Sequence, residues 1–218
     1  MNRLDPRNFV LVWDLPVRVF HWLLVISFAG AWLTAEGESL KMLHYAFGYS
    51  ACALVFFRLI WGFIGTRYAR FAQFLHGPRQ ILLHFRSLLT SQQHTSSGHN
   101  PAGGMVMVTL MAIIMAIGLT GYLQVSAVLG QSIGHFMGEV HESIASLCLA
   151  LVLLHVSVAI IMSFSQQENL IRAMVTGKKL GTPDQAIQYS MHIVGIGLAL
   201  AWGYTFYLIY SGATPGLT

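Results

Sequence analysis

Charged residues are scarce in this chain. Asp, Glu, Lys and Arg together make up 9% of its 218 residues, whereas about a quarter is usual for a soluble globular domain. Hydrophobic residues make up 55%. So few charges exclude a protein with an ordinary water-exposed surface, and they predict that lipid and neighbouring helices surround most side chains. The length suits one compact bundle, so we expect residues 1–218 to form a single transmembrane domain.

Cysteine is also rare, because the chain holds only Cys52 and Cys148. Both fall inside apolar stretches, where a small side chain is useful for packing, and this excludes a disulfide framework. The net charge of +4 is modest. Its positive groups gather in particular loops, so the charge indicates membrane topology and no nucleic-acid partner.

Five apolar stretches are each long enough to cross the hydrocarbon core of a membrane, which takes about 20 helical residues. They lie near residues 15–35, 42–63, 105–123, 140–164 and 190–211. Backbone groups in lipid need partners within the protein, and segments of this length form helices and not barrel strands. We therefore expect an all-α integral membrane helical bundle with five transmembrane helices.

Lysine and arginine are unevenly distributed between the loops. Three arginines lie at or before the start of the first helix, and the connections after the second and fourth helices carry Arg67, Arg70, Arg79, Arg86, Arg172, Lys178 and Lys179. The opposite loops carry Lys41, with Glu36, Glu38, Glu139 and Glu142 at their edges. Short loops rich in Lys and Arg stay in the cytoplasm. The sequence therefore predicts a bacterial inner-membrane protein with a cytoplasmic amino terminus and a periplasmic carboxyl terminus.

One predicted connection, from Gly65 to Gly104, is long. Its first half, Arg70 to Leu89, mixes aromatic and aliphatic residues with arginines and contains no acidic residue. Such a segment either lies in the headgroup layer or forms a partly ordered surface loop. Its second half, Ser91 to Gly104, is rich in Ser, Gly and Gln, which predicts a flexible linker.

Four of the ten histidines fall inside the first four apolar stretches, at His21, His44, His141 and His155. Ionisable residues within a membrane are costly, usually face the bundle interior and mark functional sites. Of the remaining histidines, five are expected in loops or interfacial segments, at His76, His84, His94, His99 and His135. His192, in the fifth stretch, is expected to be structural.

The predicted topology sorts these four histidines into two levels. His141 and His155 are 14 residues apart, so they share one helix face and stand about 21 Å apart along the axis. The second and fourth helices both run inward, which places His44 and His141 together near the outer face. This outer pair leaves His21 and His155 as an inner pair near the cytoplasmic face.

Two histidines that face each other across a bundle suit a haem iron, with one imidazole at each axial position. Gly48 is one turn from His44 and would leave room for a flat macrocycle, although glycine there would also permit close helix packing. Arg58 and Arg18 are candidates to pair with haem propionates, and snorkelling to the interface is the alternative for Arg58.

A transporter that binds zinc or copper is a second interpretation of buried histidines. Such a site usually adds carboxylates, cysteines or methionines that converge at one depth. The acidic residues of this chain lie at the margins of its predicted helices. This distribution disfavours the transporter.

Short motifs follow one another along the first four predicted helices. They are WDLPVRVFHW at 13–22, HYAFGY at 44–49, FRLIWG at 57–62, GHNPAG at 98–103, VHE at 140–142 and LHV at 154–156. In this order and spacing they resemble the bacterial cytochrome b561 family, which includes the b-type subunits of nickel–iron hydrogenases. The fifth helix departs from the family's minimal four-helix pattern.

The resemblance implies a four-helix core that holds two b-type haems, one on His21 and His155 and the other on His44 and His141. It also implies electron exchange between the quinone pool and a redox partner, such as a periplasmic c-type cytochrome or a hydrogenase. Some similar proteins oxidise superoxide and reduce quinone instead. How the fifth helix affects association, including formation of a homodimer, stays open.

Three functions therefore remain under consideration. The first is quinone-linked electron transfer to a protein partner. The second is superoxide oxidation with reduction of quinone. It would favour a positively charged outer surface, whereas the outer loops here carry Lys41 beside several glutamates. A haem-bearing membrane anchor without its own substrate site is the third.

Overall fold

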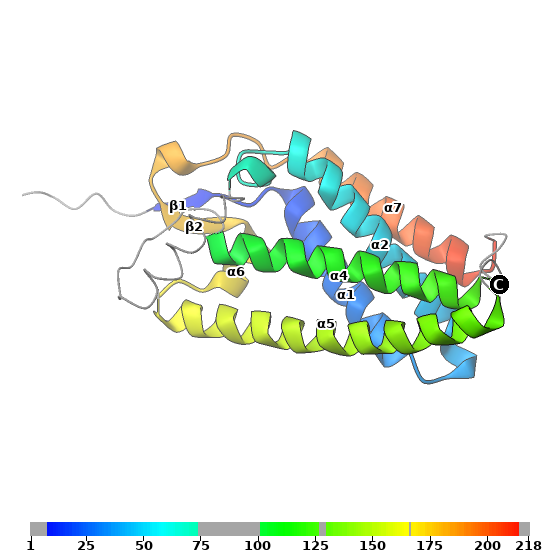
Figure 1. The fold of residues 1–218 in the computed structure, drawn as a ribbon. Coiled ribbons are helices and arrows are strands. Elements are labelled where there is room, and N and C mark those ends of the chain that lie inside the picture. Colours follow the sequence, from blue (N-terminus) through cyan, green and yellow to red (C-terminus); the bar gives the residue numbers. More distant parts are fainter. Residues whose placement is uncertain (1–7, 74–100, 127–129, 166, 214–218) are drawn as a thin grey trace, which may run out of the picture.

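A computed structural model describes residues 8–73, 101–126, 130–165 and 167–213 of the chain. Its long helices are α1 (Leu15–Leu33), α2 (Lys41–Ile64), α4 (Pro101–Val125), α5 (Gln131–Ser165) and α7 (His192–Tyr210). A short helix, α6 (Leu170–Thr176), and two strands, β1 (Asn8–Leu11) and β2 (Lys178–Gly181), complete the main elements (Figure 1). Among the described residues, five helical segments are long and apolar enough to cross a membrane, which confirms the all-α membrane bundle.

Two helices begin earlier than the sequence predicted. α4 starts at Pro101, so residues 101–104 are helical and the prediction of a flexible linker is wrong there; proline fits the first turn of a helix because its missing N–H needs no partner. α5 starts at Gln131, so His135, which was expected in a loop or an interfacial segment, lies in the first two turns of this helix. At about 1.5 Å per residue α5 is about 50 Å long, so it extends beyond a hydrocarbon core of about 30 Å. Most of residues 70–100 lies outside the described residues.

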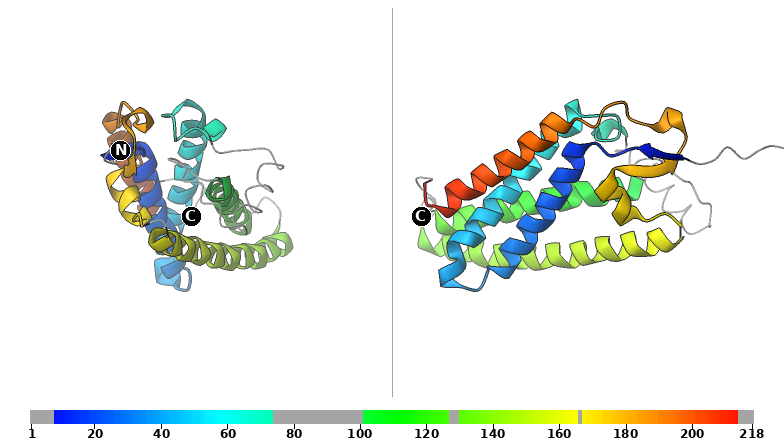
Figure 2. Two further views of the ribbon diagram at one scale, coloured as in Figure 1. Left: turned by 90° about the vertical axis from the view of Figure 1, so that its left-hand side faces the viewer. Right: turned by 180° about the vertical axis from the view of Figure 1, so that it is seen from behind.

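The helices pack as two antiparallel pairs with a fifth helix on one side. α4 packs along α5, α1 packs along α2, and α2 also contacts α4. α7 packs on α1 and α2, on the opposite side of the bundle from α5 (Figures 1 and 2). The four helices that carry the predicted motifs therefore form the core, and α7 is an addition to one flank.

An apolar cluster fills the middle of the four-helix core. Cys148 on α5 is fully buried there with Ala51 and Val55 of α2, Ile114 of α4 and the partly buried Phe28 of α1. Cys148 lies midway between the two histidines of α5, so this cluster separates the outer pair from the inner pair. Both cysteines are free thiols, as the sequence predicted.

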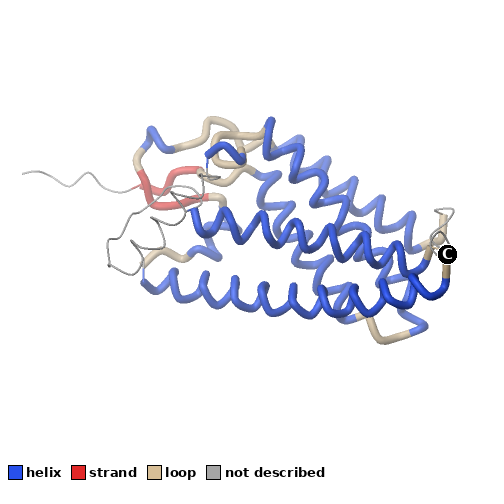
Figure 3. Tube along the Cα trace, viewed as in Figure 1, coloured by secondary structure: helices blue, strands red, loops and turns tan. Residues whose placement is uncertain are grey.

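One end of the bundle carries most of the described positive charge and is called the basic end here. It holds Arg18, Arg58, Arg67, Arg70, Arg172, Lys178 and Lys179. The two strands form a small antiparallel sheet at this end, close to α6 (Figure 3). The opposite end, called the acidic end, carries Lys41 together with Glu36, Glu38, Glu139 and Glu142.

A buried carboxylate joins the first two helices at the basic end. Asp14 is 1% exposed and caps α1 by accepting a hydrogen bond from the Val17 backbone N–H at 2.8 Å. Its other oxygen accepts from the indole N–H of Trp61 at 3.0 Å and from the Thr66 hydroxyl at 2.7 Å. The Trp13–Trp22 and Phe57–Gly62 motifs thus meet at this carboxylate, which sets how α1 and α2 are aligned.

Candidate metal centres

The structure brings the two histidines of the outer pair together. The imidazole centroids of His44 on α2 and His141 on α5 lie 6.1 Å apart, with an angle of 70° between the ring planes. Both side chains are partly buried. The two helices are far apart in sequence, so this meeting of imidazoles depends on the whole four-helix arrangement.

Backbone carbonyls hold both rings of the outer pair. Nδ1 of His44 is 2.8 Å from the Ala31 carbonyl of α1, and Nδ1 of His141 is 2.9 Å from the Ile117 carbonyl of α4. A carbonyl only accepts, so each Nδ1 carries the proton and each Nε2 keeps a free lone pair. Metal-binding histidines are commonly oriented in this way by a second hydrogen bond.

The local structure explains why these carbonyls are available. Ala31 lies in the last turn of α1, and its carbonyl also accepts from the Thr34 hydroxyl at 3.3 Å, so its second lone pair serves His44. On α4, a side-chain carbon at Gly121 would lie 3.0 Å from Cε1 of His141. Glycine at this position therefore lets the His141 ring approach α4 and reach the Ile117 carbonyl.

The ring separation suits a metal ion bonded to both imidazoles. A metal–nitrogen bond is about 2.0 Å long, and an ion bonded to two opposed imidazoles separates their centroids by about 6 Å. The outer pair already has this spacing, at 6.1 Å. Among the described residues no group of three or more His, Cys, Asp or Glu converges on a point. An axially ligated haem needs only two histidines.

Gly48 lies beside open space. A side-chain carbon built at Gly48 would meet no atom within 4 Å, and Gly48 is one turn from His44 on α2. No neighbouring helix in the described structure packs against this position. Close helix packing, the alternative interpretation of Gly48, is therefore disfavoured. The space is available to a flat group held between the two imidazoles.

The two histidines of the inner pair, His21 on α1 and His155 on α5, lie close enough to affect each other electrostatically, and the His155 side chain is exposed. Among the described residues no hydrogen bond orients either ring. Nδ1 of His21 is buried without a hydrogen-bond partner among the described residues. The His21 ring contacts Trp22 edge to face, with centroids 5.1 Å apart.

Arg58 retains hydrogen-bond donors that the described structure does not satisfy. This side chain is 1% exposed, so it does not snorkel to the interface. Its Nη2 donates to the Ala69 carbonyl at 2.9 Å, while Nε and Nη1 are buried without partners. Arg18 donates from Nη1 to the Val175 carbonyl at 2.7 Å, and its Nε is also unpartnered. Buried guanidinium donors of this kind require an anionic partner such as a carboxylate.

The remaining described histidines lie apart from both pairs. His135 is exposed on α5 and its Nδ1 lies 3.7 Å from a Glu139 oxygen. His192 begins α7. His76, His84, His94 and His99 lie outside the described residues.

The profile of the prokaryotic cytochrome b561 family matches residues 12–177 of this chain, which is most of its length. The chain belongs to this family. A curated relative from Rhizobium leguminosarum bv. viciae, named "Probable Ni/Fe-hydrogenase B-type cytochrome subunit", is 24% identical over 217 residues. That similarity covers 80% of this chain and 90% of the relative.

Membership in the cytochrome b561 family makes this chain a multi-pass membrane b-type cytochrome that transfers electrons, and its cofactor is haem b. The matched region contains α1, α2, α4 and α5 and ends before α7, which begins at His192. The family core therefore coincides with the four helices that carry the two histidine pairs.

Proposed function

We propose that this cytochrome binds two haem b groups and passes electrons between the quinone pool and a redox partner. His44 and His141 would hold the outer haem through Nε2, and His21 and His155 would hold the inner haem. The observation that carries the proposal is the outer pair, in which two imidazoles, each oriented by a backbone carbonyl, lie with their centroids 6.1 Å apart. When bound, each haem supplies a one-electron carrier, so two haems match the two electrons that separate a quinol from a quinone.

The protein's own residues would place the haems and tune their surroundings. The carbonyls of Ala31 and Ile117 fix the tautomers of the outer ligands and make them more basic. The unpartnered donors of Arg58 would pair with a propionate of the inner haem, and the remaining donor of Arg18 would do the same. The apolar cluster around Cys148 keeps water from the region between the two haems.

We propose that the basic end faces the cytoplasm of a bacterial inner membrane and the acidic end faces the periplasm, because Lys and Arg gather on the cytoplasmic side. The amino terminus is then cytoplasmic and the carboxyl terminus periplasmic. The partner would bind at the acidic end, near the outer haem. The name of the Rhizobium relative favours a hydrogenase, and a periplasmic c-type cytochrome is the other candidate.

Charge at the acidic end argues against superoxide as the substrate. Exposed glutamates there include Glu38 and Glu139, whose side chains are 92% and 67% exposed. A negatively charged surface repels a small anion and attracts a basic protein face. A protein partner is therefore the better match to this end.

A quinol reduction assay tests the proposed function. The purified cytochrome is mixed with a short-chain quinol without oxygen, and the absorbance of the reduced haem is followed. We expect haem reduction to approach the level given by dithionite. If dithionite reduces the haem and the quinol does not, the protein is better described as a haem-bearing anchor that depends on a partner for its electrons.

Substitution of Gly48 tests whether the open space beside His44 is used. Gly48→Leu is expected to lower the haem content from two per chain toward one, because the leucine side chain would occupy the space proposed for the macrocycle. Gly203→Leu is the matched control, since a side chain at this α7 glycine also meets no atom within 4 Å. A pyridine haemochrome assay measures both variants. Equal haem content in Gly48→Leu and the wild type would show that the haem lies elsewhere.

A further inference from the structure

A cavity of about 430 Å³ lies between α2 and α7. Its lining includes Ser50 and Phe57 from α2, and Gly197, Trp202 and Thr205 from α7. A volume of this size is within the range of small-molecule sites, which is about 300–1,000 Å³. None of the lining residues is Lys, Arg, Asp or Glu. The cavity therefore suits an uncharged molecule that dissolves in the membrane.

Ser50 supplies an unsatisfied polar group among these apolar residues. Its side chain is 0% exposed, and its hydroxyl has no hydrogen-bond partner in the described structure. Three other helical serines of this chain donate to the carbonyl four residues earlier, namely Ser143, Ser157 and Ser163. A buried hydroxyl without a hydrogen-bond partner costs free energy. An oxygen atom of a bound molecule could accept the hydrogen bond that Ser50 does not make within the protein.

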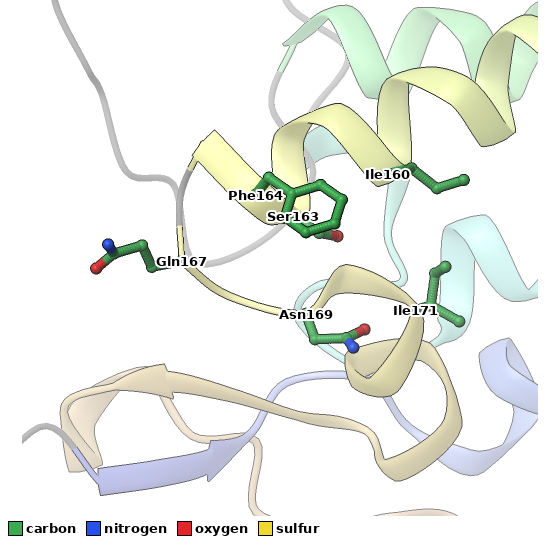
Figure 4. Close-up of a pocket in the computed structure, with 6 residues that line it drawn as sticks. All are labelled: Ile160, Ser163, Phe164, Gln167, Asn169 and Ile171. Carbon is green, nitrogen blue, oxygen red and sulfur yellow. The ribbon is translucent and has the colours of Figure 1, made fainter.

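A second cavity has, among its described lining residues, no unpartnered hydroxyl comparable to that of Ser50. It has a volume of about 350 Å³ and lies between the end of α5 and α6 (Figure 4). There the Ser163 hydroxyl donates to the Ala159 carbonyl at 2.7 Å and accepts from the Leu170 N–H at 3.0 Å. The Asn169 side chain accepts from the Arg172 N–H at 2.7 Å, and the Gln167 side chain points away from the other lining residues. The Ser163 hydroxyl and the Asn169 oxygen already have partners, and none of the described lining residues has a buried polar atom without one.

The cavity between α2 and α7 lies close to the inner pair. Leu54 and Leu198, which line it, form one buried cluster with Phe20 of α1. Phe20 directly precedes His21 on that helix. This cluster therefore connects the cavity wall, which is built from α2 and α7, to the part of α1 that carries the inner pair.

We propose that this cavity binds the head group of a quinone and that the Ser50 hydroxyl donates a hydrogen bond to one of its carbonyl oxygens. The inference rests on the proposed quinone-linked function and names the site at which the quinone binds. Ser50 lies near the middle of the membrane-spanning part of α2. At that depth a phospholipid presents only its acyl chains, which have no oxygen to accept from Ser50, whereas a quinone carries carbonyls on an apolar ring.

The proposal gives α7 a function. This helix lies outside the region matched by the family, and the cavity exists only because α7 packs on α2. Trp202 is fixed in the wall by a hydrogen bond from its indole N–H to the Ser27 hydroxyl of α1, at 2.9 Å. The extra helix therefore completes a binding site on the flank of the four-helix core.

Binding of a short-chain ubiquinone to the purified holo-cytochrome tests the proposal. Gly197→Phe places a ring in the cavity from a position where a side-chain carbon meets no atom within 4 Å, and we expect it to weaken ubiquinone binding at least tenfold. Gly203→Phe, on the same helix but outside the lining, is expected to bind like the wild type. Ser50→Ala removes one hydrogen bond and should weaken binding by roughly three- to tenfold. The Ser50→Ala chain should fold at least as well as the wild type, because it loses a hydroxyl that has no partner.

Quinone retained after gel filtration is extracted and measured per haem, and haem reduction by quinol is recorded for the same samples. Wild-type-like binding in Gly197→Phe would overturn the proposal, as would recovery of phospholipid in place of quinone from the cavity. If the quinol reduces the wild-type haem and Gly197→Phe equally, the proposed function stands and this site is wrong. If the quinol fails to reduce the wild-type haem although ubiquinone binding depends on Gly197, the site stands and the proposed function fails.

Discussion

His141→Ala is expected to lose the outer haem while the inner haem remains. The variant removes one of the two imidazoles whose centroids are 6.1 Å apart, and alanine offers no ligand in its place. The reduced-minus-oxidised spectrum should fall to about half of the wild-type amplitude, because each haem contributes separately. His155→Ala should give a similar loss from the inner site. The two single variants are therefore expected to retain different haems, which spectra at low temperature would distinguish.

His135→Ala is a matched control on the same helix. Its side chain is 81% exposed and its only described polar contact is with Glu139, so its removal should leave both haems in place. Full haem content in His141→Ala would contradict the outer site. Equal haem loss in His135→Ala and His141→Ala would indicate that the α5 substitutions disturb folding and not ligation.

Asp14→Ala is expected to cause the largest loss of stability of any substitution outside the histidine pairs. It leaves the Trp61 indole N–H, the Thr66 hydroxyl and the Val17 N–H without their acceptor in a buried place. Hydrogen bonds to a charged group contribute roughly 1.5–3 kcal/mol each, and because these three share one carboxylate the combined loss is about 3 kcal/mol. For a protein of this size that corresponds to a decrease of about 6–12 °C in the midpoint of thermal denaturation.

Glu38→Gln provides the comparison for Asp14→Ala. Glu38 is a surface carboxylate whose side chain is 92% exposed and lies 3.6 Å from the Lys41 ammonium. Exposed ion pairs contribute about 0–1 kcal/mol, so this variant should denature within about 4 °C of the wild type. Denaturation in detergent, followed by the loss of haem absorbance, measures both. A midpoint for Asp14→Ala close to that of Glu38→Gln would show that the capping carboxylate does not hold α1 and α2 together.

The membrane helices and the depth of each histidine follow directly from the sequence. Apolar length fixes where helices cross the membrane, and the spacing of His141 and His155 places them at different depths on one face. Topology then brings His44 and His141 to the same level, and the structure places their rings side by side. These features depend on local composition and on periodicity, and both can be read directly from a sequence.

The groups that orient the histidines were not predicted. The Ala31 and Ile117 carbonyls are backbone atoms, so no residue type marks them. Gly121 is one glycine among 21 in the sequence, and its closeness to His141 depends on how closely α4 and α5 pack. The depth of burial of Asp14 also depends on packing, although the N-cap role of an aspartate immediately before a helix is visible in the sequence.

Long-range backbone pairing was missed as well. β1 pairs with β2 in antiparallel register, with Asn8 opposite Gly181 and Leu11 opposite Lys178. Each strand has only four residues, and their partners are separated by most of the chain. Such short strands carry little periodic signal, so only the assembled bundle reveals that they meet.

The haem content of the purified wild-type protein is the most direct test of the central claim that this cytochrome holds two haems between two pairs of histidines. A pyridine haemochrome assay on protein purified from cells supplied with excess haem precursor, combined with a quantitative amino-acid analysis, gives haem b per chain. We expect two. A single haem per chain that survives in His21→Ala and His155→Ala but is lost in His141→Ala would restrict ligation to the outer pair and contradict the two-haem pathway across the membrane.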